Sequence, residues 1–334
     1  MTASFLRLIA VVCALLPAMA AAEPIKLKLA FFSSDLSHLF RSGVKPFVDA
    51  VNAEGKDRVA IEVYLNGKLD NLAKQSQLVL DGTADIALVV PPYEPSSFPD
   101  ASVIELPGLY RDAREATLAF AHLVAAGTIR GFENYFVIGT PAGEPESMHF
   151  RPLVGSLADL KSKRIRVSNE TEIAILTKPG ATPIIMPINE TAEAISSGKI
   201  DGAMVPPVPM IEFGIGRIAQ NHYFLRTSCV PQVLLMNRKS FDSLPSDVQA
   251  LIRKYSGDWF TENYVRINET STALIMNQLE SDPHRKVVFP SPADMLTADA
   301  VFKSIVDGYA AGSPHNSELV AAARAEVAKL RPGH

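Results

Sequence analysis

Two arginines in a short basic segment are the side chains best suited to bind an anion. Arg164 and Arg166 both lie in the segment Lys163–Val167, and strand alternation would point them to the same side. A guanidinium meets a carboxylate through two parallel, charge-assisted hydrogen bonds, and it stays ionised when partly buried. Either arginine is therefore a candidate clamp for an anionic ligand. The alternative is that this basic strand is only a solvated face.

Sequence patterns typical of catalysis or metal binding are missing. The chain has no G-x-S-x-G nucleophile elbow, no H-E-x-x-H zinc motif and no G-x-x-x-x-G-K-S/T phosphate loop. Cys229 has no evident base, and a lone cysteine usually packs as an inert side chain. The seven histidines are scattered without metal-ligand spacing, at His38, His122, His149, His222, His284, His315 and His334. We therefore expect a binding protein rather than an enzyme, with no metal and no cofactor.

The first 22 residues have the pattern of an export signal. Arg7 is the only charge before the apolar run Leu8–Leu16, which Pro17 ends, and small residues follow. The run is too short for a membrane span, which needs roughly 20 apolar residues. We expect cleavage after Ala20 or Ala22 and a periplasmic mature protein.

Length and charge narrow the class of protein further. The chain has 334 residues, a formal net charge of −4 and 47% hydrophobic residues. A slight acidic excess argues against nucleic acid as a partner, and against a polybasic membrane surface. Chains of this size usually form two domains. Only Cys229 would remain after signal removal, so core burial rather than an internal disulfide must stabilise the fold.

Strands and helices alternate twice along the chain, which is typical of α/β layers with largely parallel sheets. The strands of the first unit are expected near 25–29, 59–65 and 85–90, and those of a second unit, beginning near residue 142, at 163–167, 183–186 and 201–205. Another strand is expected at 232–237. One helical pattern runs from Asp247 to about Leu279, and the tail from Thr297 to Leu330 is helical with a break near Gly312.

The two units end a strand in the same way. Residues 82–89 and 198–205 each run from a helix-ending glycine through an aspartate to an apolar strand, and a proline pair follows. Asp85 and Asp201 are best interpreted as turn or cap residues. Ligands of open α/β sheets bind beyond the carboxyl ends of strands. Residues 91–98 and 205–210 are therefore expected near a shared cleft.

Four passages resemble the substrate-binding component of TRAP transporters (tripartite ATP-independent periplasmic transporters), the DctP-type family. They span most of the chain in the family's order and are Leu80–Ala87 ("L-x-x-G-x-x-D"), Glu105–Pro107 ("x-L-P"), Leu157–Val167 ("DLKGLKIRV") and Asn237–Pro245 ("N-x-x-x-W/F-x-x-LP").

The resemblance implies an α/β, two-lobed periplasmic binding protein (type II-like) whose lobes are joined by crossing strands and a long helix. One lobe would comprise 24–141 plus 232–271 and the other 142–231 plus 272–334. It also implies an organic carboxylate held by Arg166 and delivered to TRAP membrane subunits, one small and one large integral membrane protein. An ABC-type or sensor-linked receptor for a similar anion is the alternative.

Departures from the family pattern indicate the kind of acid. Val205 replaces a polar asparagine, and Glu144, Pro145 and Glu146 occupy the stretch where some relatives carry a second arginine. We therefore expect a monocarboxylate with an apolar body. The candidate ligand-binding residues besides Arg166 are Phe32, Tyr93, Phe98, Met186, Val205, Met210 and Gln232.

Overall fold

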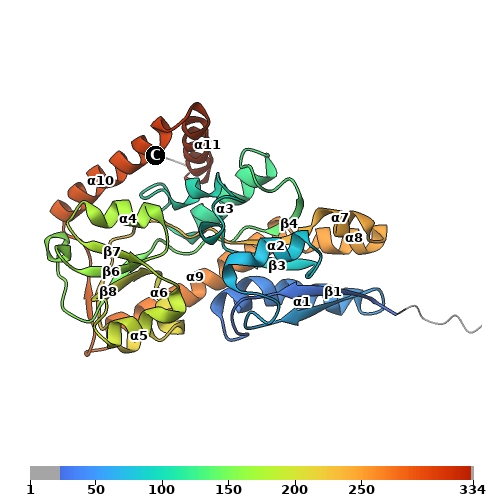
Figure 1. Ribbon diagram of the computed structural model, residues 1–334, viewed down its shortest axis with the longest axis horizontal. Helices are drawn as coiled ribbons and strands as arrows, with labels where there is room; N and C mark the ends of the chain where they lie inside the picture. The colour runs from blue at the N-terminus through green and yellow to red at the C-terminus, as the bar shows by residue number, and fades with distance from the viewer. Residues whose placement is uncertain (1–22, 332–334) are drawn as a thin grey trace, which may run out of the picture.

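The computed structural model describes residues 23–331, so the expected export signal lies outside the described residues. Two sheets form two lobes (Figure 1). The first sheet has the order β2-β1-β3-β10-β4, in which β1, β2 and β3 are parallel and β10 is antiparallel to both neighbours. Its strands are β1 (Ile25–Ala30), β2 (Val59–Tyr64), β3 (Ile86–Val89), β4 (Tyr135–Gly139) and β10 (Val233–Asn237).

The second sheet has the order β11-β9-β5-β8-β6-β7. Strands β6, β7 and β8 are parallel, and β5 is antiparallel to β8 and β9. The strands are β5 (Ser147–Phe150), β6 (Arg164–Val167), β7 (Thr182–Ile185), β8 (Gly202–Val205), β9 (Asn221–Tyr223) and β11 (Lys286–Val288). The expected α/β architecture with two lobes is confirmed.

Helices cover both faces of each sheet, because the central strands are buried on both sides and need apolar cover. On the first sheet, α1 (Lys45–Gly55), α7 (Arg238–Ser243) and α8 (Ser246–Lys254) pack on one face, and α2 (Gln75–Leu80) and α3 (Ala113–Ala125) on the other. On the second sheet, α4 (Glu170–Thr177) and α10 (Pro292–Ala311) lie opposite α5 (Thr191–Ser196) and α6 (Pro207–Glu212). The short helices are η1 (Phe40–Val44), η2 (Leu72–Lys74), η3 (Pro91–Tyr93), η4 (Ala101–Glu105), η5 (Leu157–Leu160), η6 (Ile188–Glu190) and η7 (Ile215–Arg217).

The shared strand endings have the same geometry in both lobes. Gly82 and Gly198 adopt positive φ angles of 79° and 75°, which glycine tolerates best. The Asp85 carboxylate accepts the backbone N–H of Lys28 at 2.8 Å, and the Asp201 carboxylate accepts that of Arg164 at 2.8 Å. Each aspartate thus ties its strand to a parallel neighbour, which fits the expected turn role.

The long helix is interrupted, which corrects the expected single helix from Asp247 to Leu279. Helix α8 ends at Lys254, and α9 runs over Asp258–Ser281. Gly257 at the break has φ 59°, and its backbone N–H donates to the carbonyl of Ile138 rather than continuing a helix. The 24 residues of α9 still extend about 36 Å. Figure 1 shows α9 running from one lobe to the other.

The last helix, α11 (Pro314–Leu330), packs on the first lobe and on α10, whereas residues 272–334 are assigned to the second lobe above. Leu319, Val320 and Ala323 are buried in the core beside α3. Ala298 and Phe302 of α10 pack on the second sheet, whereas Val306 of the same helix packs in the first-lobe core, so the chain crosses between the lobes within α10. Among residues 23–331, no helix combines the length and apolar character that a membrane crossing requires.

Candidate ligand-binding cleft

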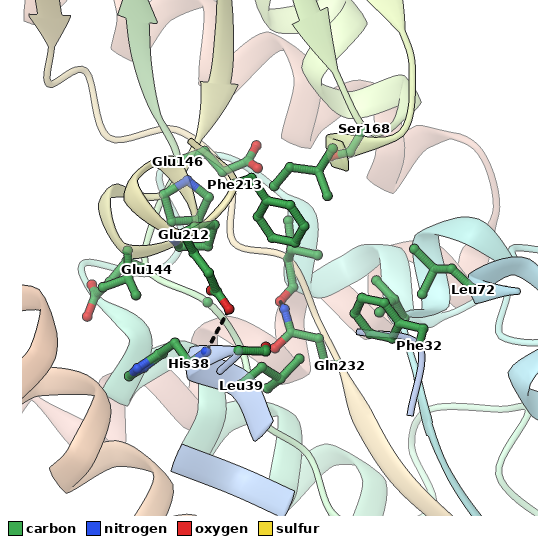
Figure 2. A pocket seen from close by; sticks show the side chains of 18 of the residues that line it. Phe32, His38, Leu39, Leu72, Glu144, Glu146, Ser168, Glu212, Phe213 and Gln232 are labelled. Carbon is green, nitrogen blue, oxygen red and sulfur yellow. Dashed lines mark hydrogen bonds between the residues drawn. The ribbon is translucent and has the colours of Figure 1, made fainter. Parts of the chain in front are cut away.

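A cleft of about 920 Å³, including its open mouth, lies between the two lobes. Several of its wall residues come soon after the end of a strand. Phe32 follows β1, Tyr93 follows β3, Ser168 follows β6 and Pro206 follows β8. Backbone amides and side chains of both lobes therefore converge at the carboxyl ends of strands, where α/β proteins bind ligands. Figure 2 shows side chains approaching the cleft from both sides.

Arg166 on β6 is buried against the cleft, with only 2% of its surface exposed. Its Nε donates to the carbonyl of Met186 at 3.0 Å, and its Nη1 donates to the carbonyl of Met204 at 3.1 Å. Nη2 lies 3.4 Å from the hydroxyl of Tyr93, across the cleft. Within residues 23–331, no carboxylate oxygen is hydrogen-bonded to this guanidinium. Two carbonyls thus hold the plane of the cation and leave its charge uncompensated by a direct ion pair.

Arg164, the other candidate clamp, does not line the cleft. Its side chain is 43% exposed and forms a hydrogen-bonded ion pair with Asp201, with Nη2 3.0 Å from Oδ1. Asp201, which directly precedes β8, therefore neutralises the charge of Arg164. Two residues further along β6, Arg166 lies beyond the reach of that carboxylate and faces the other lobe.

Tyr93 lies in η3, directly after the proline pair that ends the first-lobe strand. Burial raises the pKa of its hydroxyl, so the group is neutral and can both donate and accept. Its contact with Arg166 joins the two lobes at the base of the cleft.

A second interlobe contact lies at the other side of the cleft. The backbone N–H of His38 donates to Oε1 of Glu212 at 2.8 Å, as Figure 2 shows. His38 Nε2 lies 3.1 Å from Asn268 Oδ1, and Asn268 Nδ2 donates to Glu144 Oε1 at 3.0 Å. Burial lowers the pKa of His38 and raises those of Glu144 and Glu212. No motif in the sequence signals this group, because its members come from four separate segments.

Glu146 is the most buried carboxyl group of the cleft wall, with 2% exposure. Its Oε2 has no hydrogen-bond partner. Burial raises the pKa of Glu146 well above its usual range, and the nearby Glu172 carboxylate raises it further. Glu172 itself accepts hydrogen bonds from the backbone N–H and the hydroxyl of Ser168, at 2.8 and 2.5 Å, and from Asn169 at 2.9 Å.

Four of the eight residues expected to bind ligand line the cleft: Arg166, Tyr93, Phe32 and Gln232. The other four, Phe98, Met186, Val205 and Met210, do not line the cleft as expected, because their side chains are buried in the cores of the lobes. Phe98 stacks at a tilt on Phe132 in the first-lobe core. The side chains of Met186, Val205 and Met210 pack in the core of the second lobe.

The direction of the side chains explains why the expected wall residues of the second lobe lie in its core. Met186 directly follows β7 and Val205 ends β8, but the side chains of both residues point into the core. Met186 offers the cleft only its carbonyl, which orients Arg166. Wall residues that sequence reasoning did not single out include the apolar side chains Leu39, Leu72, Val90, Ile188, Val208 and Phe213.

Known proteins match both the sequence and the fold. The family model described as bacterial extracellular solute-binding protein, family 7 (DctP) matches residues 33–312. A solute-binding protein of Sulfitobacter sp. (strain NAS-14.1) is 24% identical over 256 residues, which cover 75% of this chain and 77% of that protein.

Two solved structures have the same fold. A TRAP solute-binding protein from Rhodoferax ferrireducens T118, in complex with copurified benzoate, superposes with a TM-score of 0.83 at 22% identity, covering 91% of this chain and 98% of that one. A TRAP periplasmic solute-binding protein from Bordetella bronchiseptica, with bound (R)- and (S)-mandelate, gives 0.80 at 20% identity, covering 92% and 100%. Two lobes meeting at strand ends, a cleft between them and a family match over most of the chain lead to one conclusion: this protein belongs to the DctP family of bacterial extracellular solute-binding proteins.

Proposed function

We propose that this protein is the periplasmic receptor of a TRAP transporter and that it binds a small monocarboxylate with an apolar body in the interlobe cleft. Arg166 binds the carboxylate, and Tyr93, Phe32 and Gln232 complete its surroundings. The receptor then delivers the acid to the membrane subunits of the transporter. Export to the periplasm would remove the signal after Ala20 or Ala22.

The observation that carries the proposal is the buried guanidinium of Arg166. Burying a cation without a directly paired carboxylate is costly, so such a group is retained where a ligand supplies that partner. The two carbonyls that hold Arg166 fix its orientation and leave Nη2 with only a 3.4 Å contact to Tyr93. A carboxylate entering beside Tyr93 would receive the hydrogens of that nitrogen.

The rest of the wall favours an apolar ligand body. In Figure 2, Phe32 and Leu72 lie together on one side of the cleft and Phe213 lies apart from them, and further aliphatic residues line the wall. Similar proteins have been solved with benzoate, mandelate and galacturonate, each a monocarboxylate on a different body. The apolar wall supports an aromatic or branched aliphatic acid over a sugar acid.

Calorimetry on an Arg166 series tests the proposal. We expect wild type to bind at least one of benzoate, phenylacetate, mandelate and 4-methylpentanoate, and galacturonate weakly or not at all. Arg166→Gln should lose about 2–5 kcal/mol of binding free energy, and Arg166→Lys should recover only part of it because an ammonium lacks the planar fork. A ligand present at about 100 times its dissociation constant should also stabilise wild type by about 2.7 kcal/mol, which a melting curve detects.

Arg164→Gln is the matched control, since it removes the same group two residues away and outside the cleft. It should leave binding of every acid unchanged. Wild-type affinity in Arg166→Gln, or binding of uncharged solutes only, would refute the proposal. Uptake of the bound acid by cells that contain the receptor but lack its TRAP membrane subunits would refute the assignment of the partner.

A further inference from the structure

We propose that Glu146 contacts the ligand and selects carboxylic acids that carry a hydrogen-bond donor, a hydroxyl or amino group, close to the carboxylate. This inference rests on the proposed function, because Arg166 must hold the carboxylate for Glu146 to sense its neighbouring group. It narrows the ligand from any apolar monocarboxylate to a donor-bearing one.

The backbone of Glu146 is fixed, so its side chain has little freedom to turn away. Its N–H donates to the carbonyl of Ser228 at 2.8 Å, and its carbonyl accepts from both the backbone and the hydroxyl of Thr227, at 3.1 and 3.0 Å. These bonds clamp the start of β5 against the returning crossing segment. The carboxyl group is thereby presented to the cleft wall, where Figure 2 shows it on the side of Ser168.

Glu146 is 2% exposed, and no N–H or hydroxyl group within residues 23–331 donates to its Oε2. The Glu172 carboxyl lies close enough for the two groups to share a proton, which would satisfy one oxygen of Glu146 and leave the other as an acceptor. Buried polar atoms are almost always hydrogen-bonded, so an orphan acceptor at a cleft wall indicates a donor that arrives from outside. The neighbouring donors are already used, since Ser168 and Asn169 both donate to Glu172.

An orphan carboxyl oxygen accepts hydrogen bonds whether or not its group is protonated. Burial and the adjacent Glu172 raise the pKa of Glu146, and Arg166 opposes that rise, which places the two ligand-facing groups within electrostatic reach of one another. A ligand whose carboxylate meets Arg166 therefore has its adjacent atoms near Glu146. A hydroxyl or ammonium there donates to the Glu146 carboxyl group, whereas a keto oxygen would face another acceptor.

The charged groups around the cleft also support a ligand donor beside Glu146. Three carboxyl groups, Glu144, Glu146 and Glu212, line the cleft with a single arginine. Glu144 and Glu212 have protein partners, from Asn268 and from the backbone of His38. Glu146 is the only one of the three whose side chain receives no such bond, and it lies within electrostatic reach of Arg166.

Calorimetry with four acids of one body tests the inference. Phenylacetate has no donor, phenylglyoxylate has an acceptor, mandelate has a hydroxyl and phenylglycine has an ammonium. We expect wild type to bind mandelate or phenylglycine at least tenfold more tightly than phenylacetate or phenylglyoxylate. The matched aliphatic series, 4-methylpentanoate with its 2-oxo, 2-hydroxy and 2-amino forms, should give the same order.

Variants of Glu146 separate contact from folding. Glu146→Met should abolish the preference for donors and change phenylacetate affinity less than threefold. Glu146→Gln keeps an oxygen acceptor without the charge, so it should retain binding of mandelate, and a loss confined to phenylglycine would identify the ionised carboxylate. Glu144→Met removes a carboxyl group with protein partners and should shift all four affinities by one common factor.

Two results would overturn the inference while leaving the proposed function intact. One is wild-type affinity for phenylacetate equal to that for mandelate and phenylglycine. The other is a donor preference that persists in Glu146→Met. If Glu146→Met does not fold, the wild-type series and Glu146→Gln decide between the same outcomes. Binding of none of the acids in either series would instead refute the proposed function, and this inference with it.

Discussion

Acid should destabilise the second lobe through a buried pair of histidines. His149 and His222 face each other on β5 and β9 with their Nδ1 atoms 2.9 Å apart. His149 Nε2 lies 3.1 Å from the carbonyl of Val205, which can only accept, so this nitrogen carries the proton. Its Nδ1 then accepts from His222, whose Nε2 in turn accepts from Arg285 at 3.2 Å. Both rings are neutral in this arrangement, and either extra proton would break it.

The size of the effect follows from the pKa values. Burial, and then the neighbouring His222, lowers the pKa of His149 well below its usual range. Burial, and then Arg285, lowers the pKa of His222 from 6.5 to about 4. His222 therefore becomes protonated near pH 6.5 in the unfolded chain but only near pH 4 in the folded protein. Stability is full above pH 6.5 and falls as the pH drops, by about 3 kcal/mol for His222 alone.

Urea unfolding at pH 7.0 and pH 4.5 measures this loss, with Trp259, the single tryptophan, as the fluorescence probe. His222→Asn keeps a donor near the position of Nδ1 and removes the titrating ring. Between pH 7.0 and pH 4.5, the free energy of unfolding of wild type should fall by about 2–3 kcal/mol more than that of His222→Asn. The same change at the exposed His284 is the control, and it should leave the wild-type difference unaltered.

Carboxyl groups that titrate in this range affect all three proteins equally, so only the difference between them counts. An equal pH-dependent loss in wild type and His222→Asn would refute the neutral histidine chain. The neutral histidine chain would also be refuted if the pH-dependent loss of stability in His284→Asn were as small as that in His222→Asn.

Two packing and charge predictions follow from other parts of the fold. Gly139→Ala should cost about 1–3 kcal/mol, because its new Cβ would stand 2.1 Å from Cδ1 of Phe260, whereas Gly308→Ala, in open space within α10, should be neutral or stabilising by urea denaturation. Glu115→Gln should lower the melting temperature. Burial alone would raise the pKa of Glu115, but hydrogen bonds, led by that from Arg331, hold it at about 2, and the variant removes the buried carboxylate that pairs with Arg331 and Arg111. Melting temperatures equal to wild type in Gly139→Ala or Glu115→Gln would contradict these expectations.

Local pattern was sufficient to find seven of the strands and the family, but not β4, β5, β9 or β11. Period-two alternation at Ile25–Leu29 and the glycine-aspartate-strand-proline repeat depend on residues a few positions apart, and the structure has strands and turns there. The ordered family motifs identified the two-lobed architecture, and they placed Arg166 at the end of a strand that borders the cleft. Each of these features is written in short stretches of chain.

Tertiary structure decided what such stretches cannot specify. Arg164 and Arg166 have similar sequence surroundings. Arg164 is paired because Asp201 lies beside it on the neighbouring strand end, whereas Arg166 lies in the cleft beside Tyr93. The sides to which Met186 and Val205 turn depend on their register with neighbouring strands, and the break at Gly257 depends on a bond to a distant carbonyl.

The sequence by itself therefore determined the alternating α/β order of the main elements and the family to which they belong. The tertiary structure decided which side chains meet, as it does where His38, Glu144, Glu212 and Asn268 close the cleft from four segments. The physical reason is range. Propensity and periodicity act over a few residues, whereas burial, pairing and the orphan oxygen of Glu146 are set by segments that are brought together only when both lobes have packed.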